Sequence, residues 1–391
     1  MPAAQPLKAE IIRSISLIGA ADWNACAPSG NPFLSHAFFL ALEQSGCTTA
    51  DTGWQPYHLV IRGEDTPADQ MAQSDDIAAI VPLFLKGHSY GEYVFDHGWA
   101  DAYERAGGHY YPKLQSAVPF TPVTGSRLMV RHDHEHLRAS LLAAARSACE
   151  ELGLSSLHMT FMPEAEALEA RDAGYLIRTD QQFHWHNDNY RCFDDFLAAL
   201  ASRKRKQIKK ERRRVADQQV SFRHVLGTDV REKDWDSFFT FYTDTGNRKW
   251  GTPYLNRDFF SLIGQSMADR ILLILCEHEG ETIAGALNFI GDDTLYGRYW
   301  GCTEMFDNLH FETCYYQAME YAIAHGIRHV EAGAQGPHKL ARGYTPQKTY
   351  SAHWIPNPGF RDAVARYLDA ERRDVDAEID YLGSHAPFKK G

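Results

Sequence analysis

The chain has 391 residues, of which 44% are hydrophobic and 12% aromatic, and it carries a formal net charge of −11. This length is enough for two or three domains, and the composition is that of a packed soluble protein rather than of a disordered chain. No apolar run approaches the ~20 residues that span a bilayer, no signal-peptide pattern opens the chain, and the cysteines are scattered without a CxxC pair, so we expect a cytoplasmic protein without a metal site.

In the first half of the chain, hydrophobic periodicity predicts short strands alternating with helices. Helices are expected at residues 35–45, 135–152 and 164–173, and strands at 57–62, 77–86, 90–95, 127–130, 156–161, 175–179 and 183–186. Residues 96–125 are rich in aromatic residues, glycine and proline, and we predict a long ordered loop with a functional role.

The second half is predicted to begin with a basic helix at residues 194–216 and to end with a charged helix at 360–382. Between them we expect strands at 220–225, 271–278, 282–290, 294–300, 327–330 and 351–355, and helices at 234–246, 256–267 and 308–325. The order of hairpin, third strand, helix and strand occurs in both halves. It predicts two related α/β domains, residues 1–190 and 191–391, each with a mixed sheet flanked by helices.

Positive charge is concentrated in residues 202–214, which read SRKRKQIKKERRR and carry a net charge of +8, so that the rest of the chain carries −19. Such an island on an acidic protein predicts contact with phosphate groups, for example those of tRNA. The alternatives are a surface that meets anionic lipid and a helix face that is merely solvated. The residues predicted to contact nucleic acid are Arg203, Lys204, Arg205, Lys206, Lys209 and Lys210.

Many polar groups follow the predicted strand at residues 327–330, interspersed with glycines. Ligands of open α/β sheets bind in the crevice outside strand ends, and glycine allows close backbone approach. We therefore predict that this segment forms the floor of an active site; the alternative is a solvated turn whose charges form surface pairs. Its polar residues are Glu331, Gln335, His338, Lys339, Arg342 and Tyr344.

Five strings of the sequence resemble the FemAB-like N-acyltransferases, a family also described as peptidoglycan biosynthesis/recognition proteins. They are YYPKLQSAVPFTPVTG at 110–125, RKWGTPYLNRDFF at 248–260, LYGRYWG at 295–301, HFETCYYQAMEYAI at 310–323 and EAGAQGPHKLARGYTP at 331–346. The resemblance implies two tandem domains like those of the GNAT (Gcn5-related) acetyltransferases. It also implies kinship with the Fem peptidyltransferases, which use aminoacyl-tRNA, and their basic helix region is similar to residues 203–214.

One feature departs from the acetyl-CoA-binding GNAT pattern. The junction between the third strand and the next helix reads WGCTEMFDNLHFET at 300–313 and lacks the glycine-rich loop whose N–H groups would hold a pyrophosphate. The matching region of the first domain, TGSRLMVRHDHEHLR at 124–138, also lacks it. This departure favours a donor other than a conventionally bound acetyl-CoA.

Acyl transfer to an amine needs a group that takes up a proton and a group that stabilises the oxyanion. Glu331 is a candidate base, although it could instead pair with Arg298 or Lys339, and Glu312 is a second candidate. His338 is a candidate proton shuttle and Tyr344 a candidate oxyanion donor. Each of these side chains has an alternative structural role.

Substrate binding is predicted for a larger set. Lys339 and Arg342 suit an anionic group, Tyr316 shares a helix face with Glu312, and aromatic residues of the long loop suit an amphipathic ligand, unless that loop merely packs between domains. The full set is Lys339, Arg342, Gln335, Tyr299, Trp300, Tyr316, Asp96, Trp99, Tyr111, Lys113 and Gln115.

The leading hypothesis is an N-acyltransferase that moves an activated acyl or aminoacyl group onto an amine acceptor, with no cofactor and no transmembrane segment. Aminoacyl-tRNA, the donor of the Fem peptidyltransferases, is one candidate donor, and the sequence leaves the identity of donor and acceptor open. An acyl-CoA donor is the alternative within enzymes. A non-catalytic module that binds peptidoglycan or nucleic acid is the alternative outside them.

Overall fold

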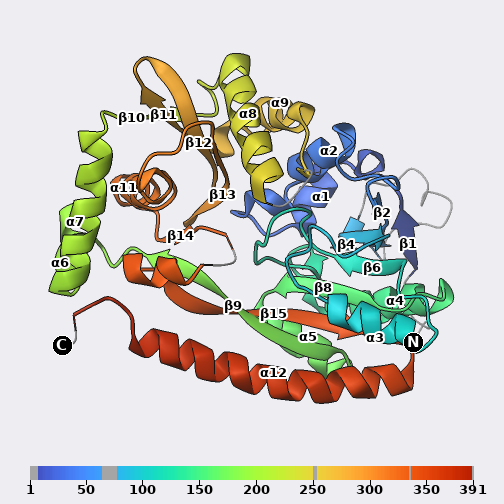
Figure 1. Cartoon of the computed structure of the whole chain (residues 1–391). Coiled ribbons are helices and arrows are strands. Elements are labelled where there is room, and N and C mark those ends of the chain that lie inside the picture. Colours follow the sequence, from blue (N-terminus) through green and yellow to red (C-terminus); the bar gives the residue numbers. More distant parts are fainter. Residues whose placement is uncertain (1–7, 64–76, 250–252, 334–335, 390–391) are drawn as a thin grey trace. The chain divides into compact units, whose positions relative to one another are not determined.

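The computed structural model describes residues 8–63, 77–249, 253–333 and 336–389 (Figure 1). It divides into two compact units: unit 1 is Met1–Asp180 with Thr349–Val375, and unit 2 is Gln181–Lys348 with Asp376–Gly391. Each is a mixed α/β structure with sheets flanked by helices, as the sequence predicts. No helix of the described residues is both long and apolar enough to cross a membrane.

Unit 1 contains two sheets. Strands β1 (Ala9–Ile12), β3 (His58–Arg62), β4 (Ile77–Val81) and β7 (Met129–Val130) form an antiparallel sheet. Strands β2 (Trp54–Pro56), β5 (Leu83–Lys86), β6 (Lys113–Ser116), β8 (Leu157–Met162) and β15 (Thr345–Trp354) form the second, in which only the β6–β8 pair is parallel. The helices of unit 1 are α1 (Ala20–Cys26), α2 (His36–Gln44), α3 (His97–Arg105), α4 (Arg138–Glu151) and α5 (Glu164–Asp172).

Three predictions for unit 1 differ from the structure. The single strand expected at 77–86 is broken by Pro82, which has no N–H to donate to a ladder, and its halves β4 and β5 belong to different sheets. The strand expected at 90–95 is a series of turns in which Gly91 and Tyr93 have positive φ. The long loop expected at 96–125 contains helix α3 and strand β6.

Unit 2 has one sheet, in the order β10 (Ser221–Leu226), β11 (Ile271–His278), β12 (Glu281–Ile290), β13 (Thr294–Cys302), β14 (His329–Glu331) and β9 (Leu176–His186). Only β13 and β14 are parallel. Its helices are α6 (Phe193–Ala199), α7 (Ser202–Asp217), α8 (Glu232–Lys249), α9 (Arg257–Ser266), α10 (Leu309–Phe311), the π-helix η5 (Glu312–Tyr316), α11 (Gln317–Ala324) and the 3-10 helix η6 (Pro337–Arg342).

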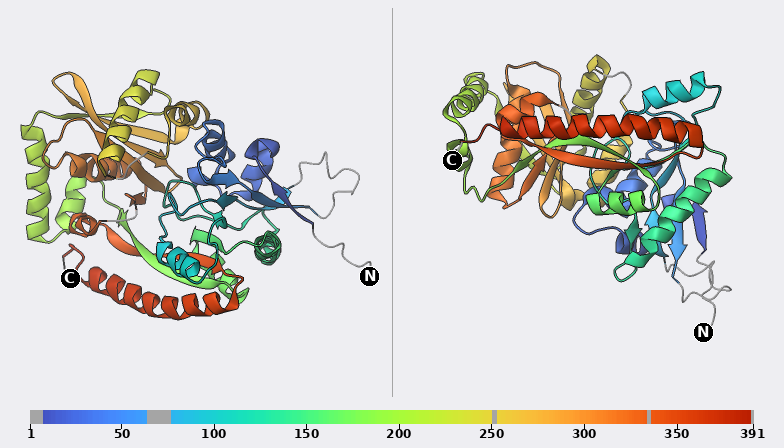
Figure 2. Two further views of the ribbon diagram at one scale, coloured as in Figure 1. Left: turned by 45° about the vertical axis from the view of Figure 1, so that its right-hand side comes forward. Right: turned by 90° about the horizontal axis from the view of Figure 1, so that it is seen from below.

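The chain passes between the units three times. Strand β9 crosses at residue 180, β15 crosses back at 348, and helix α12 (Pro358–Ser384) crosses at 375. The sequence predicted two strands where β9 is one, and a single boundary at 190. In unit 1 the first part of α12 lies beside β9 (Figure 2), where Arg178 forms two hydrogen bonds of 2.7 and 2.8 Å with Glu371.

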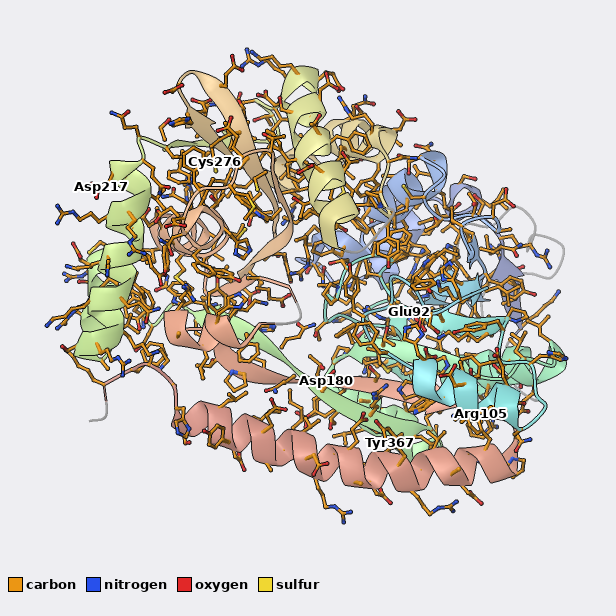
Figure 3. All side chains as sticks on the ribbon, viewed as in Figure 1. Glu92, Arg105, Asp180, Asp217, Cys276 and Tyr367 are labelled. Atoms are coloured by element: carbon orange, nitrogen blue, oxygen red, sulfur yellow. The ribbon has the colours of Figure 1, made fainter. Side chains whose placement is uncertain are left out.

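Packing explains why each unit folds around its own core. In unit 1, helix α4 buries Leu141, Leu142, Ala145 and Cys149, one helical face, against strands β3, β4 and β8. In unit 2, helix α11 and η5 bury Tyr315, Tyr316, Met319 and Ala322 against β11, β12 and β13. Figure 3 shows the side chains on every element, with Cys276 inside the sheet of unit 2.

Candidate active site

Strands β13 and β14 pair over only three positions, from Thr294 with His329 to Tyr296 with Glu331. Beyond these positions strand β13 no longer pairs with β14, but it continues to pair with β12 on its other side. There Leu287 pairs with Tyr299 and Asn288 with Gly297, so Arg298 is the extra residue of a β-bulge. The result is a fork: beyond Tyr296, strand β13 has lost its parallel neighbour, and the bulge redirects its side chains.

A pocket of about 90 Å³, which we name the fork pocket, lies at this place in unit 2. Strands β12 and β13, the start of the following helix and the residue after β14 supply its walls. The lining residues are Ala286, Asn288, Gly297, Arg298, Tyr299, Trp300, His310, Cys314, Tyr315 and Ala332.

Glu331, the last residue of β14, is held at the fork by an ion pair. Its Oε2 accepts a 2.5 Å hydrogen bond from Nη2 of Arg298, whose side chain is 1% exposed against 9% for that of Glu331. Nε2 of His184 lies 3.7 Å from the other carboxylate oxygen, and burial lowers the pKa of His184, which keeps that ring neutral. The pairing with Arg298 that the sequence left open is therefore present, and it fixes the carboxylate beside the pocket.

Lys339 is a buried amine beside the same pair. Its side chain comes from η6, the residue is 1% exposed, and Nζ donates a 2.8 Å hydrogen bond to the carbonyl of Gly333. Burial is the largest cause that lowers the pKa of Lys339 to about 7; the charge of Arg298 acts in the same direction, and Cys314 and Glu331 act in the opposite one. No described carboxylate forms an ion pair with Nζ. At neutral pH both protonation states are therefore populated, which suits proton transfer.

Arg342 lies one helical turn further along η6, but both of its Nη atoms are engaged within the protein. Nη2 forms a 2.8 Å ion pair with Glu211 of α7, Nη1 donates to the carbonyl of His338 at 2.8 Å, and the guanidinium lies 3.5 Å from the ring centre of Phe311. Tyr316 donates to the other oxygen of Glu211. Glu211, the one acid of the basic island, thus fastens η6 to α7.

We expect Arg342→Met to destabilise the protein more than it impairs chemistry. The substitution leaves the Glu211 carboxylate buried without its guanidinium, which costs on the order of 3–5 kcal/mol of unfolding free energy. Urea denaturation measures this loss. Arg213→Met, at an exposed position of the same helix, is the control and should change stability by about 0.5 kcal/mol or less. A loss below about 1 kcal/mol for Arg342→Met would show that the pair does not anchor η6.

Glu312 is likewise engaged. Arg212 of α7 donates to both of its carboxylate oxygens at 2.9–3.2 Å, and Nε2 of Gln317 donates at 2.8 Å. Arg212 also pairs with Glu320. The two candidate carboxylates therefore differ in their surroundings. Glu331 lies at the fork, whereas Glu312 belongs to a network of charged residues between η5 and α7.

Aromatic residues form the side of the site next to η6. The hydroxyl of Tyr315 and Nε2 of His338 are 2.8 Å apart, and the Tyr315 ring meets that of Tyr344 at 5.3 Å. The Tyr344 hydroxyl is buried and has no hydrogen-bond partner among the described residues. Tyr299 and Trp300 both line the fork pocket. Gln335 lies outside the residues that the structure describes.

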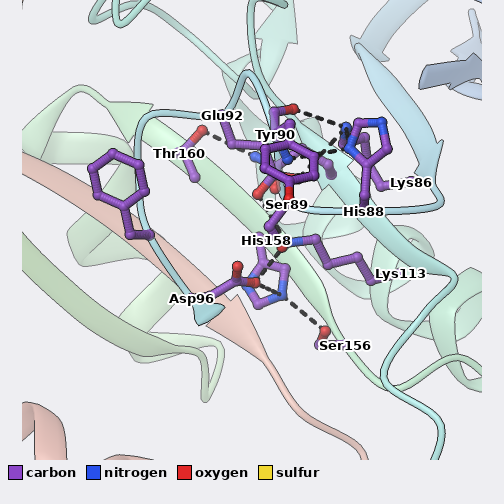
Figure 4. A network of polar contacts seen from close by, with 12 residues as sticks. Lys86, His88, Ser89, Tyr90, Glu92, Asp96, Lys113, Ser156, His158 and Thr160 are labelled. Atoms are coloured by element: carbon purple, nitrogen blue, oxygen red, sulfur yellow. Dashed lines mark hydrogen bonds and ion pairs between the residues drawn. The ribbon is translucent and has the colours of Figure 1, made fainter. Parts of the chain in front are cut away.

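The candidates from unit 1 gather in a buried polar network (Figure 4). Nζ of Lys113, which is fully buried, donates to Asp96 at 2.5 Å, to Glu92 at 2.8 Å and to Ser89 at 2.8 Å; the hydroxyl of Tyr111 is 2.8 Å from that of Ser89. The other two candidates are also buried: the Trp99 ring packs on His353, and Gln115 donates to Thr160 at 3.0 Å.

Sequence reasoning missed three members of this network. Burial lowers the pKa of Lys86 to about 7 and that of His158 to about 3, and it raises the pKa of Glu92 to about 7. These shifts show strong desolvation, and the groups are paired with members of this network inside unit 1. Near the end of the parallel β6–β8 pair, Arg127 is fully buried and donates to the carbonyls of Thr160 and Val123.

The basic island forms helix α7, the second part of what the sequence predicted as a single helix; a break at Leu200 and Ala201 separates it from α6. Arg203, Lys206 and Lys210 are exposed at a spacing of three and four residues, and no described carboxylate pairs with them. Lys209 is exposed and lies 3.6 Å from Asp194, and Lys204 and Arg205 are half-buried. Figure 3 labels Asp217, the last residue of α7, and shows side chains projecting from the helix along its length.

The family model for FemAB-like proteins, described as peptidoglycan biosynthesis/recognition, matches residues 14–390. No curated protein sequence matches.

Three solved structures are similar in fold. A crystal structure of FemX has a TM-score of 0.55 at 12% identity, covering 92% of this chain and 100% of that one. The C-terminal domain of a protein described as a lysylphosphatidylglycerol synthetase from Agrobacterium fabrum has a TM-score of 0.52 at 9% identity, covering 91% and 95%. The structure of L-PGS from Bacillus licheniformis has a TM-score of 0.50 at 9% identity, covering 88% and 98%.

Proposed function

We propose, on the premise that this chain belongs to the FemAB-like family of peptidoglycan biosynthesis/recognition proteins and is an acyltransferase, that it transfers an aminoacyl group onto an amine at the fork pocket of unit 2. The proposal rests on the burial of Lys339 and on its lowered pKa. A buried lysine with a pKa of about 7 beside an arginine-held carboxylate is a perturbed group of the kind that gathers at active sites.

The proposed chemistry assigns a role to each residue of the fork. The amine nitrogen of the acceptor forms a bond to the acyl carbon, and the bond from that carbon to the carrier oxygen breaks. Neutral Lys339 takes the proton from the attacking nitrogen at Nζ and returns it to the leaving oxygen. Arg298, fixed by Glu331, keeps a positive charge where the carbonyl oxygen becomes negative.

Two features favour aminoacyl-tRNA as the donor. The segment between β13 and α10, residues 303–308, has no glycine, so it does not provide the glycine-rich loop that holds the pyrophosphate of CoA. Helix α7 presents an exposed basic stripe in the same unit. A cytoplasmic location is part of this proposal, because that is where charged tRNA is found.

The donor is tested by thermal unfolding with a panel of charged tRNAs and a panel of acyl-CoA esters, followed by transfer of a radiolabelled acyl group to peptidoglycan-precursor amines. A ligand that binds only the folded state raises Tm. Stabilisation and transfer with charged tRNA support the proposal. Stabilisation and transfer with acyl-CoA alone would show that acyl-CoA, and not charged tRNA, is the donor. Binding of either ligand without transfer would contradict the assignment of the pocket as catalytic.

The basic stripe gives a separate prediction. We expect the triple variant Arg203→Glu, Lys206→Glu, Lys210→Glu to weaken tRNA binding by at least about 10-fold at physiological salt and to flatten the dependence of log K on log salt by about two to three, since up to three phosphate contacts are lost. Filter binding at several salt concentrations measures both. The control, Arg105→Glu, Arg366→Glu, Arg373→Glu at exposed positions of unit 1, makes the same charge change and should leave binding nearly intact. Equal loss in both variants would mean that only net charge matters.

A further inference from the structure

One buried amide in the fork pocket has an oxygen that the protein does not use. Asn288 of β12 is 1% exposed, and its Nδ2 donates to the backbone carbonyls of Leu272 and Ala286, each at 3.3 Å. Because both partners are acceptors, they require the NH₂ group on that side, and the orientation of the amide is fixed. Among the described residues, no group donates to Oδ1.

The unused oxygen faces the pocket. Asn288 and Gly297 are paired across β12 and β13 and both line the pocket, and a Cβ built on Gly297 would lie 3.2 Å from Oδ1 of Asn288. Oδ1 itself is buried, and because Gly297 has no side chain, nothing from that position occupies the space beside it. A buried acceptor without a partner costs free energy, so water or a ligand must supply the donor.

The size and lining of the pocket limit what can enter. With a volume of about 90 Å³, the pocket is small and has room for a few water molecules or one small chemical group. Tyr299, Trp300 and Tyr315 supply aromatic surface to the pocket that Asn288 also lines. Such a pocket suits a small group with one hydrogen-bond donor, and it disfavours an apolar group of the same shape because Oδ1 would then be left unpaired.

We propose that Asn288 determines specificity in the fork pocket: its Oδ1 accepts a hydrogen bond from an N–H or O–H group on the small acyl group that is transferred, so that α-amino or α-hydroxy acyl groups are selected over isosteric alkyl ones. This inference rests on the proposed function, because it assumes that the fork pocket receives the acyl group. It concerns the acyl group alone and does not depend on the carrier.

The test compares isosteric acyl groups on two carriers by isothermal titration calorimetry with the full chain. One series is an RNA hairpin whose 3′-terminal ribose carries an L-alanyl or an isobutyryl group through an amide. The other is lactyl-CoA and isobutyryl-CoA. Within each pair, a methyl group replaces the amine or hydroxyl group that could donate a hydrogen bond to Oδ1. In any series that binds to the protein, wild type is expected to bind the alanyl or lactyl compound at least about 10-fold more tightly than the isobutyryl compound.

Asn288→Leu, which is close to isosteric, is expected to remove that preference. Gly297→Ala, whose Cβ would occupy the space in front of Oδ1, is expected to weaken both members of the pair. Thr48→Val in unit 1 is the matched control, since it also deletes a buried oxygen without a partner, and it should keep the wild-type ratio.

The outcomes separate the two claims. Binding in the CoA series alone would replace the proposed carrier, while the ratio within that series would still test Asn288. A preference that persists in Asn288→Leu, or a wild type that binds both members equally, would overturn the role of Asn288. Absence of binding in both series would overturn it together with the proposed function.

Discussion

Lys339→Met is expected to reduce the rate of acyl transfer by at least about 100-fold, because it removes the group whose protonation state changes near neutral pH. In wild type, kcat/KM should rise with pH through about 7 as the amine of Lys339 loses its proton. The residual activity of the variant should lack this rise. A pH–rate profile of both proteins measures the effect.

The same substitution is expected to stabilise the protein. Because burial lowers the pKa of Lys339 from 10.5 to about 7, the unfolded state binds more protons between those two values, and wild-type stability increases with pH across that window. Methionine removes the cost of a buried amine, so unfolding free energy at pH 7 should rise by about 0.5–2 kcal/mol. Lost activity with gained stability distinguishes a functional lysine from a structural one.

Lys86→Met is the matched control for this experiment. Lys86 is also fully buried with its pKa lowered to about 7, but it lies in unit 1, over the ring of Trp54. Its replacement should leave the transfer rate of the folded protein within about twofold of wild type. If both lysine variants lose activity equally, buried charge in general and not the fork would be responsible.

Breaking the ion pair at the fork is the second substitution with a large expected effect. Glu331→Met leaves the Arg298 guanidinium, 1% exposed, without its carboxylate, and Arg298→Met does the reverse. Each single variant is expected to lose about 3–5 kcal/mol of stability. The double variant should recover most of this loss, since no unpaired charge remains, yet it should transfer at a rate at least about 100-fold below wild type.

A double-mutant cycle that measures both unfolding free energy and transfer rate separates a role of the ion pair in folding from a role in catalysis. The exposed pair of Arg270 with Asp292, at 2.9 Å in the same unit, is the control, and its double replacement should change stability by about 1 kcal/mol or less and leave activity unchanged. Recovery of activity together with stability in the Arg298 and Glu331 double variant would show that the pair serves folding alone.

Much of the fold followed from local patterns. The strands of the unit 2 sheet have near-continuous apolar runs or alternation, and β11 and β12 were expected within one residue of their observed bounds. What the sequence did not reveal depends on contacts between distant residues. The change of sheet at Pro82 and the crossings of β9 and β15 between the units arise from tertiary pairing, which local periodicity does not encode.

The residues of the candidate site could be predicted only in part, for the same reason. Glu331 and Lys339 stand out because they follow a strand end, and the structure places both at the fork. In the sequence, Arg342 and Glu312 looked as suitable for the site as Lys339 and Glu331. In the structure, Arg342 pairs with Glu211 and Glu312 pairs with Arg212, each more than 90 residues away in the chain. Asn288 gave no signal, because an asparagine within an apolar strand becomes informative only when its hydrogen bonds are known.

The most direct test is a crystal structure of the protein with the alanyl-bearing RNA hairpin. The account predicts that the acyl group lies in the fork pocket, with its amine at hydrogen-bond distance from Oδ1 of Asn288 and its carbonyl facing Lys339 and Arg298. An acyl group bound elsewhere, with the fork pocket holding only water, would contradict the assignment of the active site.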